Sequence, residues 1–170
     1  MCIRDSFPIH IHDPSAFEAL LPEDEAALLQ RARVLQAAWL RRDVPLQLKG
    51  KNLGIFCCEG SEDEALFQRA ARELGAHVAT LRPALSSLGG RGEIRHTGQI
   101  LSRFYDAVEC QGMAADVVRQ IGREAAIPVY DGLACASHPS ARLADRLGEL
   151  ASPADNRRFV LQALLLGSIG

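Results

Sequence analysis

The chain has 170 residues, of which 48% are hydrophobic and 24% are charged, which is typical of one compact domain with a sizeable core. Its formal net charge of −2 and its aromatic content of 5% argue against a nucleic-acid partner, because neither a basic surface nor a stacking platform is expected. No apolar run reaches the ~18 residues that are needed to cross a membrane.

The pattern of apolar residues, helix caps and turns predicts an alternation of helices and short strands. The helices are expected over residues 22–42, 63–74, 94–105, 113–125, 141–150 and 155–168. The strands are expected over residues 52–57, 77–81, 107–110 and 127–130. Pro128 indicates that the last strand begins there or lies near an edge.

This alternation predicts a single α/β domain with a parallel four-stranded sheet flanked by helices. In such sheets ligands bind beyond the carboxyl ends of the strands. Those positions fall in the loops 58–63, 82–92, 111–112 and 131–140.

The five cysteines are Cys2, Cys57, Cys58, Cys110 and Cys135. Their odd number and irregular spacing favour reduced thiols in a cytoplasmic protein. No C-x-x-C occurs, and the adjacent Cys57 and Cys58 point to opposite faces of a strand end, so they are poor ligands for one metal ion. We therefore expect neither a metal nor a cofactor.

The segment after the first strand is where an α/β domain normally holds an anion, because the N–H groups at a helix start and the helix dipole attract phosphate. Here the first turn carries Glu62, Asp63 and Glu64. Ser61 and Glu64 have the S-x-x-E spacing of a capping box, which would satisfy those N–H groups internally. The sequence thus predicts an anion site that the protein's own carboxylates fill.

Five separate stretches carry a likeness to a known family: residues 48–51 (LKGK), 70–77 (AARELGAH), 104–109 (FYDAVE), 127–133 (IPVYDGL) and 138–139 (HP). In this order they resemble the amino-terminal, carbamoyl-phosphate-binding domain of the ornithine and aspartate carbamoyltransferases, and more the ornithine branch. The resemblance implies a carbamoyl-phosphate-binding-like domain over residues 13–150 and a returning C-terminal helix over residues 151–170. Residues 1–12 form an irregular lead-in, and the first six match nothing that follows.

The family's phosphate-binding signature after the first strand is Ser-Thr-Arg-Thr. The matching positions here are Gly60, Ser61, Glu62 and Asp63, so a glutamate stands in place of the arginine. Each charge-assisted hydrogen bond from an arginine to phosphate is worth about 1.5–3 kcal/mol. Together with the departure described next, this change predicts a loss of ~10³-fold or more in affinity for the phosphate.

Two further family motifs are incomplete. The Tyr-Arg-Gly motif, which supplies a second arginine, is Cys110-Gln111-Gly112 here. In the family's His-Pro-Thr-Gln motif, His138 and Pro139 are kept and the glutamine is lost. Of the side-chain ligands that the resemblance implies, only His138 remains. Its neighbour Cys135 invites an interpretation as a Cys–His nucleophile, which lacks an orienting acid and an evident oxyanion hole.

These departures predict a carbamoyltransferase by lineage that is inactive as an enzyme. The family's amino-acid-binding second domain is also missing from the sequence. We expect a non-catalytic homologue that acts by assembly, either as a trimer of its own copies, which the resemblance implies, or with a full-length carbamoyltransferase.

Two alternatives remain open from the sequence. The acidic residues Glu62, Asp63 and Glu64, together with His138, would suit a binder of a small amine or amino acid, or an enzyme with an altered ligand. The preferred interpretation of the three acidic residues is that they are ordinary helix-start carboxylates, and His138 is equally well explained as an inherited loop histidine. The last alternative is residual ornithine or aspartate carbamoyltransferase activity.

Overall fold

The computed structural model describes residues 21–57, 60–82 and 90–170. At its centre lies a four-stranded sheet, formed by β1 (Asn52–Phe56), β2 (His77–Leu81), β3 (Ala107–Cys110) and β4 (Val129–Asp131). The strands are all parallel and lie in the order β2-β1-β3-β4. Apart from Asn52, the two inner strands β1 and β3 are fully buried, as expected of apolar strands that are covered on both faces. The predicted fold class is confirmed.

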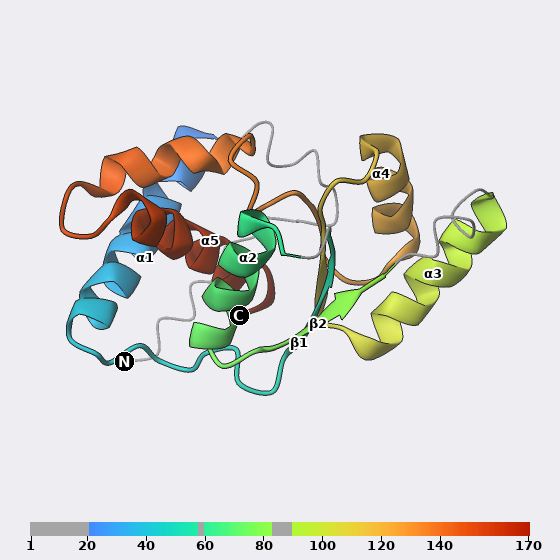
Figure 1. Cartoon of the computed structure of the whole chain (residues 1–170), viewed down its shortest axis with the longest axis horizontal. Helices are drawn as coiled ribbons and strands as arrows, with labels where there is room; N and C mark the ends of the chain where they lie inside the picture. The colour runs from blue at the N-terminus through green and yellow to red at the C-terminus, as the bar shows by residue number, and fades with distance from the viewer. Residues whose placement is uncertain (1–20, 58–59, 83–89) are drawn as a thin grey trace.

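Helices cover both faces of the sheet, as Figure 1 shows. One face carries α1 (Pro22–Leu40), α2 (Glu62–Glu73) and α5 (Pro153–Ile169), and the other carries α3 (Arg91–Phe104) and α4 (Ala115–Glu124). Helix α5 packs against α1 and α2, and its side chains from 158 to 166 are all buried. A helix that is apolar all round is a core helix, which explains the long apolar run near the end of the sequence.

Side-chain alternation along β3 separates two hydrophobic clusters. Ala107 belongs to the cluster under α1, α2 and α5, whereas Val108 and Cys110 belong to the cluster under α3 and α4. Because successive strand residues point to opposite faces, Glu109 and Gln111 lie on the same face as Ala107. Two polar side chains therefore point toward the larger core.

Helices α3 and α4 approach each other unusually closely at Gly98. A Cβ atom at this position would lie 2.9 Å from Glu124 Cβ and 3.0 Å from the Glu124 carbonyl carbon, so no larger residue fits. Next to this contact, Ser102 Oγ donates to the Gly98 carbonyl at 2.8 Å and accepts from the Ala126 N–H at 2.8 Å. Backbone contact and hydrogen bonds thus join the two helices.

All four predicted strands are present, and they differ from the predictions only at their ends. β4 is an edge strand and begins at Val129, directly after Pro128, which has no N–H to donate to a sheet. The helix expected from residue 94 already begins at Arg91. The helix expected over residues 141–150 is the 3-10 helix η2 (Pro139–Leu147), which opens with a tight bond from the Ala141 N–H to the His138 carbonyl at 2.9 Å.

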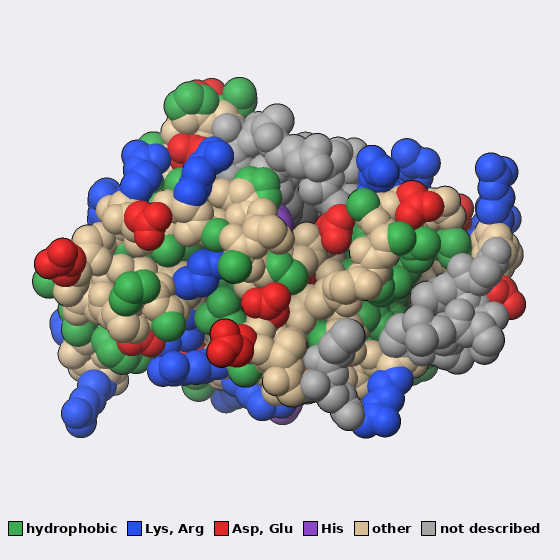
Figure 2. All heavy atoms as spheres, turned by 45° about the horizontal axis from the view of Figure 1, so that its top comes forward, with side chains coloured by type: hydrophobic (Ala, Val, Ile, Leu, Met, Phe, Trp, Pro, Cys, Tyr) green, Lys and Arg blue, Asp and Glu red, His purple; other side chains and the backbone are tan. Residues whose placement is uncertain are grey.

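Positive and negative side chains are interspersed over the face of the molecule seen in Figure 2, in keeping with the formal net charge of −2. Among the helices described, none is long and apolar enough to span a membrane.

Candidate functional site

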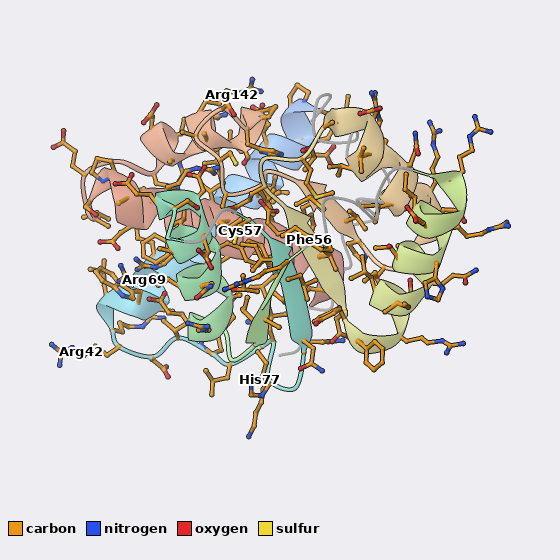
Figure 3. All side chains as sticks on the ribbon, turned by 45° about the vertical axis from the view of Figure 1, so that its right-hand side comes forward. Arg42, Phe56, Cys57, Arg69, His77 and Arg142 are labelled. Atoms are coloured by element: carbon orange, nitrogen blue, oxygen red, sulfur yellow. The ribbon has the colours of Figure 1, made fainter. Side chains whose placement is uncertain are left out.

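The carboxyl ends of the strands bring together most of the polar groups that the sequence singles out. Figure 3 shows Phe56 and Cys57 at this end of β1, whereas His77 lies at the other end of the neighbouring strand. Beyond these ends lie the start of α2, the turn after β3 and the loop of residues 132–138 that leads into η2. We refer to residues 132–138 as the β4 loop.

The start of α2 uses its own side chains as hydrogen-bond partners. Ser61 Oγ accepts the Glu64 N–H at 3.0 Å, and Glu64 Oε2 accepts the Gly60 N–H at 2.8 Å. The other carboxylate oxygen of Glu64 accepts from Gln68 Nε2 at 2.9 Å and from Thr80 Oγ1 at 3.2 Å. The predicted capping box is present, with Gly60 rather than Ser61 as the reciprocal donor, because the left-handed backbone at Gly60 (φ 79°) turns its N–H toward the carboxylate.

Glu64 therefore lies where an anion would bind. The Gly60 N–H holds the pKa of the Glu64 carboxyl below its usual range, so the group is charged at neutral pH. Glu62 is exposed at the first position of α2, and Asp63 is half-buried beside it. The start of α2 thus presents negative charge to the space beyond the sheet.

Gln111 lies at the end of β3, between β1 and the β4 loop. Its backbone N–H donates to the Phe56 carbonyl at 2.7 Å, which continues the sheet by one residue. The side chain is only 7% exposed and is directed inward, where Nε2 lies 3.5 Å from Glu109 Oε1. Gln111 is therefore part of the core beneath the site rather than a group on its surface.

His138 is neutral and has a defined tautomer. Its Nδ1 accepts the Ser140 N–H at 3.2 Å and lies 2.8 Å from Ser140 Oγ. A backbone N–H can only donate, so Nδ1 carries no proton and the proton of the neutral ring is on Nε2. Burial, followed by the charge of Arg157, lowers the pKa of His138 to about 4. The ring offers one N–H donor at neutral pH.

Arg157 is a site residue that the sequence analysis missed. From the second turn of α5, its Nη2 donates to the Leu133 carbonyl at 2.8 Å and to the Cys135 carbonyl at 3.0 Å, while Nη1 donates to Ser140 Oγ at 3.3 Å. These bonds fix the path of the β4 loop and place a cation beside His138. The signal in the sequence was weak: a basic residue near a helix start, where the helix dipole disfavours it.

Cys135 does not act as a nucleophile in this arrangement. Burial, and then a hydrogen bond to Asp63, raises the pKa of its thiol to about 12. A thiolate is needed for nucleophilic attack, and this environment suppresses it. Among the described residues, Cys57, Cys110 and Cys135 form no disulfide. Cys2 and Cys58 lie outside the described residues.

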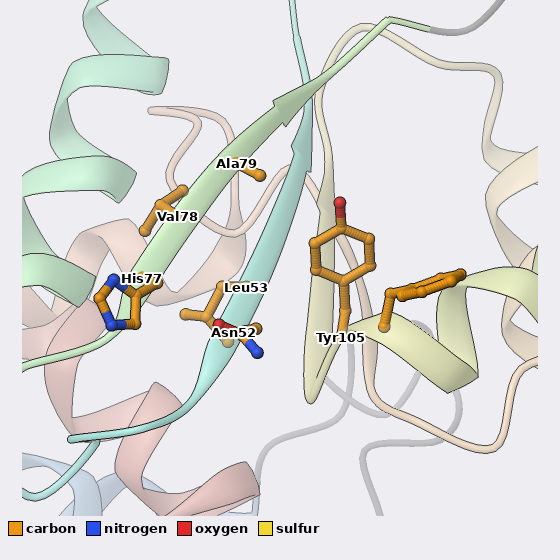
Figure 4. A pocket seen from close by; sticks show the side chains of 7 residues that line it. Asn52, Leu53, His77, Val78, Ala79 and Tyr105 are labelled. Atoms are coloured by element: carbon orange, nitrogen blue, oxygen red, sulfur yellow. The ribbon is translucent and has the colours of Figure 1, made fainter.

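Other candidates give no site. Among the residues described, no three His, Cys, Asp or Glu side chains are placed to hold a metal ion. His77 and His96 are exposed. A hollow of about 290 Å³ lies at the opposite end of the sheet, near the amino ends of β1 and β2, and its lining includes Asn52, His77 and Tyr105 (Figure 4).

The strands and helices define a parallel α/β domain, the class of fold in which ligands usually bind at the carboxyl edge of the sheet. Residues 15–148 match the family described as "Aspartate/ornithine carbamoyltransferase, carbamoyl-P binding domain". The chain belongs to this family. It is 36% identical over 121 residues to the ornithine carbamoyltransferase of Actinobacillus pleuropneumoniae serotype 5b (strain L20), a match that covers 71% of this chain and 36% of that protein. The chain thus spans little more than a third of the curated relatives that it matches.

Solved structures agree with this assignment. The ornithine carbamoyltransferase of Burkholderia thailandensis superimposes with a TM-score of 0.66 and 23% identity, over 77% of this chain and 46% of that one. The enzyme of Pyrococcus furiosus gives a TM-score of 0.62 and 25% identity, over 74% of this chain and 40% of that one. The catalytic subunit of M. jannaschii aspartate transcarbamoylase gives a TM-score of 0.60 and 22% identity, over 75% of this chain and 43% of that one. The resemblance inferred from the sequence is confirmed.

Proposed function

We propose that this chain is a carbamoyltransferase-family domain that does not bind carbamoyl phosphate and that acts by assembly rather than by catalysis. In this proposal residues 13–150 form the domain and residues 151–170 are its returning helix. The observation that carries the proposal is the 2.8 Å bond from the Gly60 N–H to the carboxylate of Glu64. It fills the position at the start of α2 where a phosphate would have to bind.

Electrostatics at the start of α2 support this proposal. A phosphate there would have to displace the Glu64 carboxylate from a charge-assisted hydrogen bond worth about 1.5–3 kcal/mol. It would also lie near Glu62 and Asp63, and at an effective dielectric constant of about 20 each like-charge pair costs roughly 3 kcal/mol at a separation of about 5 Å. Arg157 supplies a cation, but it donates hydrogen bonds to the β4 loop and to Ser140. These terms correspond to a loss of ~10³-fold or more in affinity.

A titration of carbamoyl phosphate tests the binding part of the proposal. Isothermal titration at low salt should detect no binding to the wild type. The variant Glu62→Arg restores the family's arginine at the exposed start of α2, and we expect it to gain measurable affinity. The variant Glu93→Arg is the matched control, since it makes the same change of charge at an exposed position of α3. Wild-type binding at about micromolar strength would overturn the proposal and indicate a working carbamoyl-phosphate module.

The assembly part is supported by the family. One structural relative is named as the catalytic subunit of an aspartate transcarbamoylase, so that protein functions within a larger complex. This chain also exposes large apolar side chains on α3, with Phe104 66% and Ile100 40% exposed. We expect sedimentation analysis to show a trimer of this chain, or a complex with a full-length carbamoyltransferase from the same cell. A monomer both alone and in that mixture would contradict assembly.

A second candidate is a binder of a small amine, an amino acid or a related neutral metabolite. The neutral Nε2–H of His138, the cation of Arg157 and the carboxylate of Asp63 surround the same edge, and this mixture suits a ligand that carries both donors and acceptors. A thermal-shift screen of amines and amino acids tests it. The absence of any stabilising compound would remove this candidate.

A further inference from the structure

Two polar side chains on β3 lie under the site with hydrogen-bonding atoms that lack partners. Glu109 is 0% exposed and Gln111 is 7% exposed. Gln111 Nε2 donates to Glu109 Oε1 at 3.5 Å, and the Ala134 N–H of the β4 loop donates to the same oxygen at 3.3 Å. Within the described part of the chain, Glu109 Oε2 and Gln111 Oε1 have no hydrogen-bond partner.

Both of these atoms are acceptors if Glu109 is a carboxylate. Each unsatisfied buried acceptor has lost its hydrogen bonds to water without replacement, and a buried carboxylate without a bonded cation is less favourable still. A single proton on Glu109 Oε2 resolves both, because a carboxylic acid and a primary amide are planar groups that pair edge to edge. Nε2–H then donates to Oε1 of Glu109, and Oε2–H donates to Oε1 of Gln111.

The groups that face Glu109 from the surrounding elements favour the neutral form. The negative charge of Asp131, at the end of β4, raises the pKa of Glu109. Tyr130 and Cys110 are neutral, because burial raises their pKa values. Asp63 on α2 is bonded to Cys135.

Arg157 on α5 is a cation that interacts electrostatically with Glu109, but it donates its hydrogen bonds to backbone carbonyls and a hydroxyl. Burial raises the pKa of Glu109 well above its usual range. Its surroundings thus agree with the geometry of the two unpartnered oxygens.

We propose that Glu109 is held as a neutral carboxylic acid paired with Gln111, and that this pair is a pH-sensitive contact between β3 and the β4 loop. When the proton leaves Oε2 for solvent, the bond to Gln111 is lost and a charge remains beside Asp131. Water can reach that charge only if the cover formed by Leu133 and Ala134 opens. Raising the pH therefore opens the loop that carries Cys135 and leads to His138. This inference does not depend on the ligand or on the assembly state.

The first measurement is the infrared spectrum of the whole chain in D₂O at about pH 7. We expect a protonated-carboxyl C=O band in the wild type that is absent in Glu109→Gln and retained in the exposed control Glu93→Gln. Glutamine is the isostere of the protonated acid, so the fold should be preserved. If Glu109→Gln fails to fold, the wild-type band is followed into denaturant, where it should vanish. Absence of the band from the folded wild type would overturn the proposal.

The second measurement is the pH dependence of unfolding. The folded state keeps a proton that the unfolded state releases above about pH 4.3. The free energy of unfolding of the wild type should therefore fall with rising pH, with a slope that corresponds to about one bound proton per molecule. Glu109→Gln should remove this slope, and Glu93→Gln should keep it. Hydrogen exchange should show Ala134 losing protection with rising pH in the wild type but not in Glu109→Gln. Equal slopes in wild type and Glu109→Gln would contradict the proposal.

Discussion

Arg157 and Arg158 are neighbours on α5, yet they lie in two regions of different character. Arg158 is 1% exposed and forms ion pairs with Glu73, at 2.8 Å, and with Asp155. Its guanidinium also lies 5.4 Å from the ring centroid of Trp39 and 4.9 Å from that of Phe159. Arg157 instead donates to two backbone carbonyls and a hydroxyl.

The two arginines therefore differ in role: Arg158 stabilises the packing of α5, and Arg157 lies at the candidate site. The charge of Arg158 is balanced by two carboxylates, so this arginine joins α5 to α2. The hydrogen bonds of Arg157 go to neutral acceptors rather than to a carboxylate. Asp63 acts on Arg157 through electrostatic attraction, which favours the charged guanidinium. Arg157 therefore shapes the β4 loop and keeps a positive potential at the candidate site. Four predictions test and refine this comparison.

The largest effect is expected for Arg158→Met. Loss of the guanidinium leaves Glu73 and Asp155 paired with the exposed Arg69 but without their buried cation. Removing one partner of a buried ion pair costs about 3–5 kcal/mol. We expect the free energy of unfolding to fall by about 3 kcal/mol, the lower end of this range, since the side chains of Glu73 and Asp155 are 26% and 19% exposed. Urea unfolding measures it. A loss below about 1 kcal/mol would show that the network is not a stabilising one.

Arg157→Met should cost less, about 1–2 kcal/mol, because only neutral acceptors lose their donor. Hydrogen exchange should localise the effect to the β4 loop and the start of η2. Arg157→Lys is the matched control, since it keeps the charge but cannot reach all three acceptors in one plane. If Arg157→Met destabilises as much as Arg158→Met, the two regions do not differ as described.

Ser61→Ala should cost about 1 kcal/mol at all pH values, because it removes the cap of α2. Glu64→Gln should differ, since the folded-state pKa of Glu64 is lowered. Its contribution is fully present above the unfolded pKa of about 4.3 and is lost as the pH falls through the folded value. Acid titrations of stability should thus be flatter in Glu64→Gln than in Ser61→Ala. Parallel curves would contradict the role given to the carboxylate.

The smallest effect concerns His138. With a folded pKa of about 4, the ring should remain the Nε2–H tautomer in nitrogen NMR spectra down to about pH 5. The unfolded chain binds a proton near pH 6.5, so stability should fall as the pH drops from about 6.5 toward 4. His138→Gln should remove that slope. A ring that titrates near pH 6.5 in the folded protein would disprove the assignment.

The sequence predicted those parts of the structure that depend on neighbouring residues. Ser61 and Glu64 form their cap within one turn, so their spacing was sufficient to predict it. The likeness over several motifs predicted the family and the sheet. Arg157 was missed because its partner Leu133 is 24 residues away and only the packing of α5 brings them together.

Glu109 was missed for a related reason. A single carboxylate in a short apolar strand gives no periodic signal, and whether it is paired depends on the β4 loop. The side chain of Gln111 was expected beside a ligand, and the structure directs it inward to Glu109. Packing between distant segments decided both points.

The close approach at Gly98 has a mechanical consequence. Gly98 of α3 lies against the Glu124 backbone of α4, and Ser102 of α3 accepts the Ala126 N–H just after α4. Sliding one helix along the other would therefore break contacts that no side-chain rotation can replace. We therefore expect α3 and α4 to move as one rigid unit, which is connected to the sheet through the adjoining loops. A displacement imposed on α4 at the carboxyl edge reaches the far end of α3 without being absorbed between them.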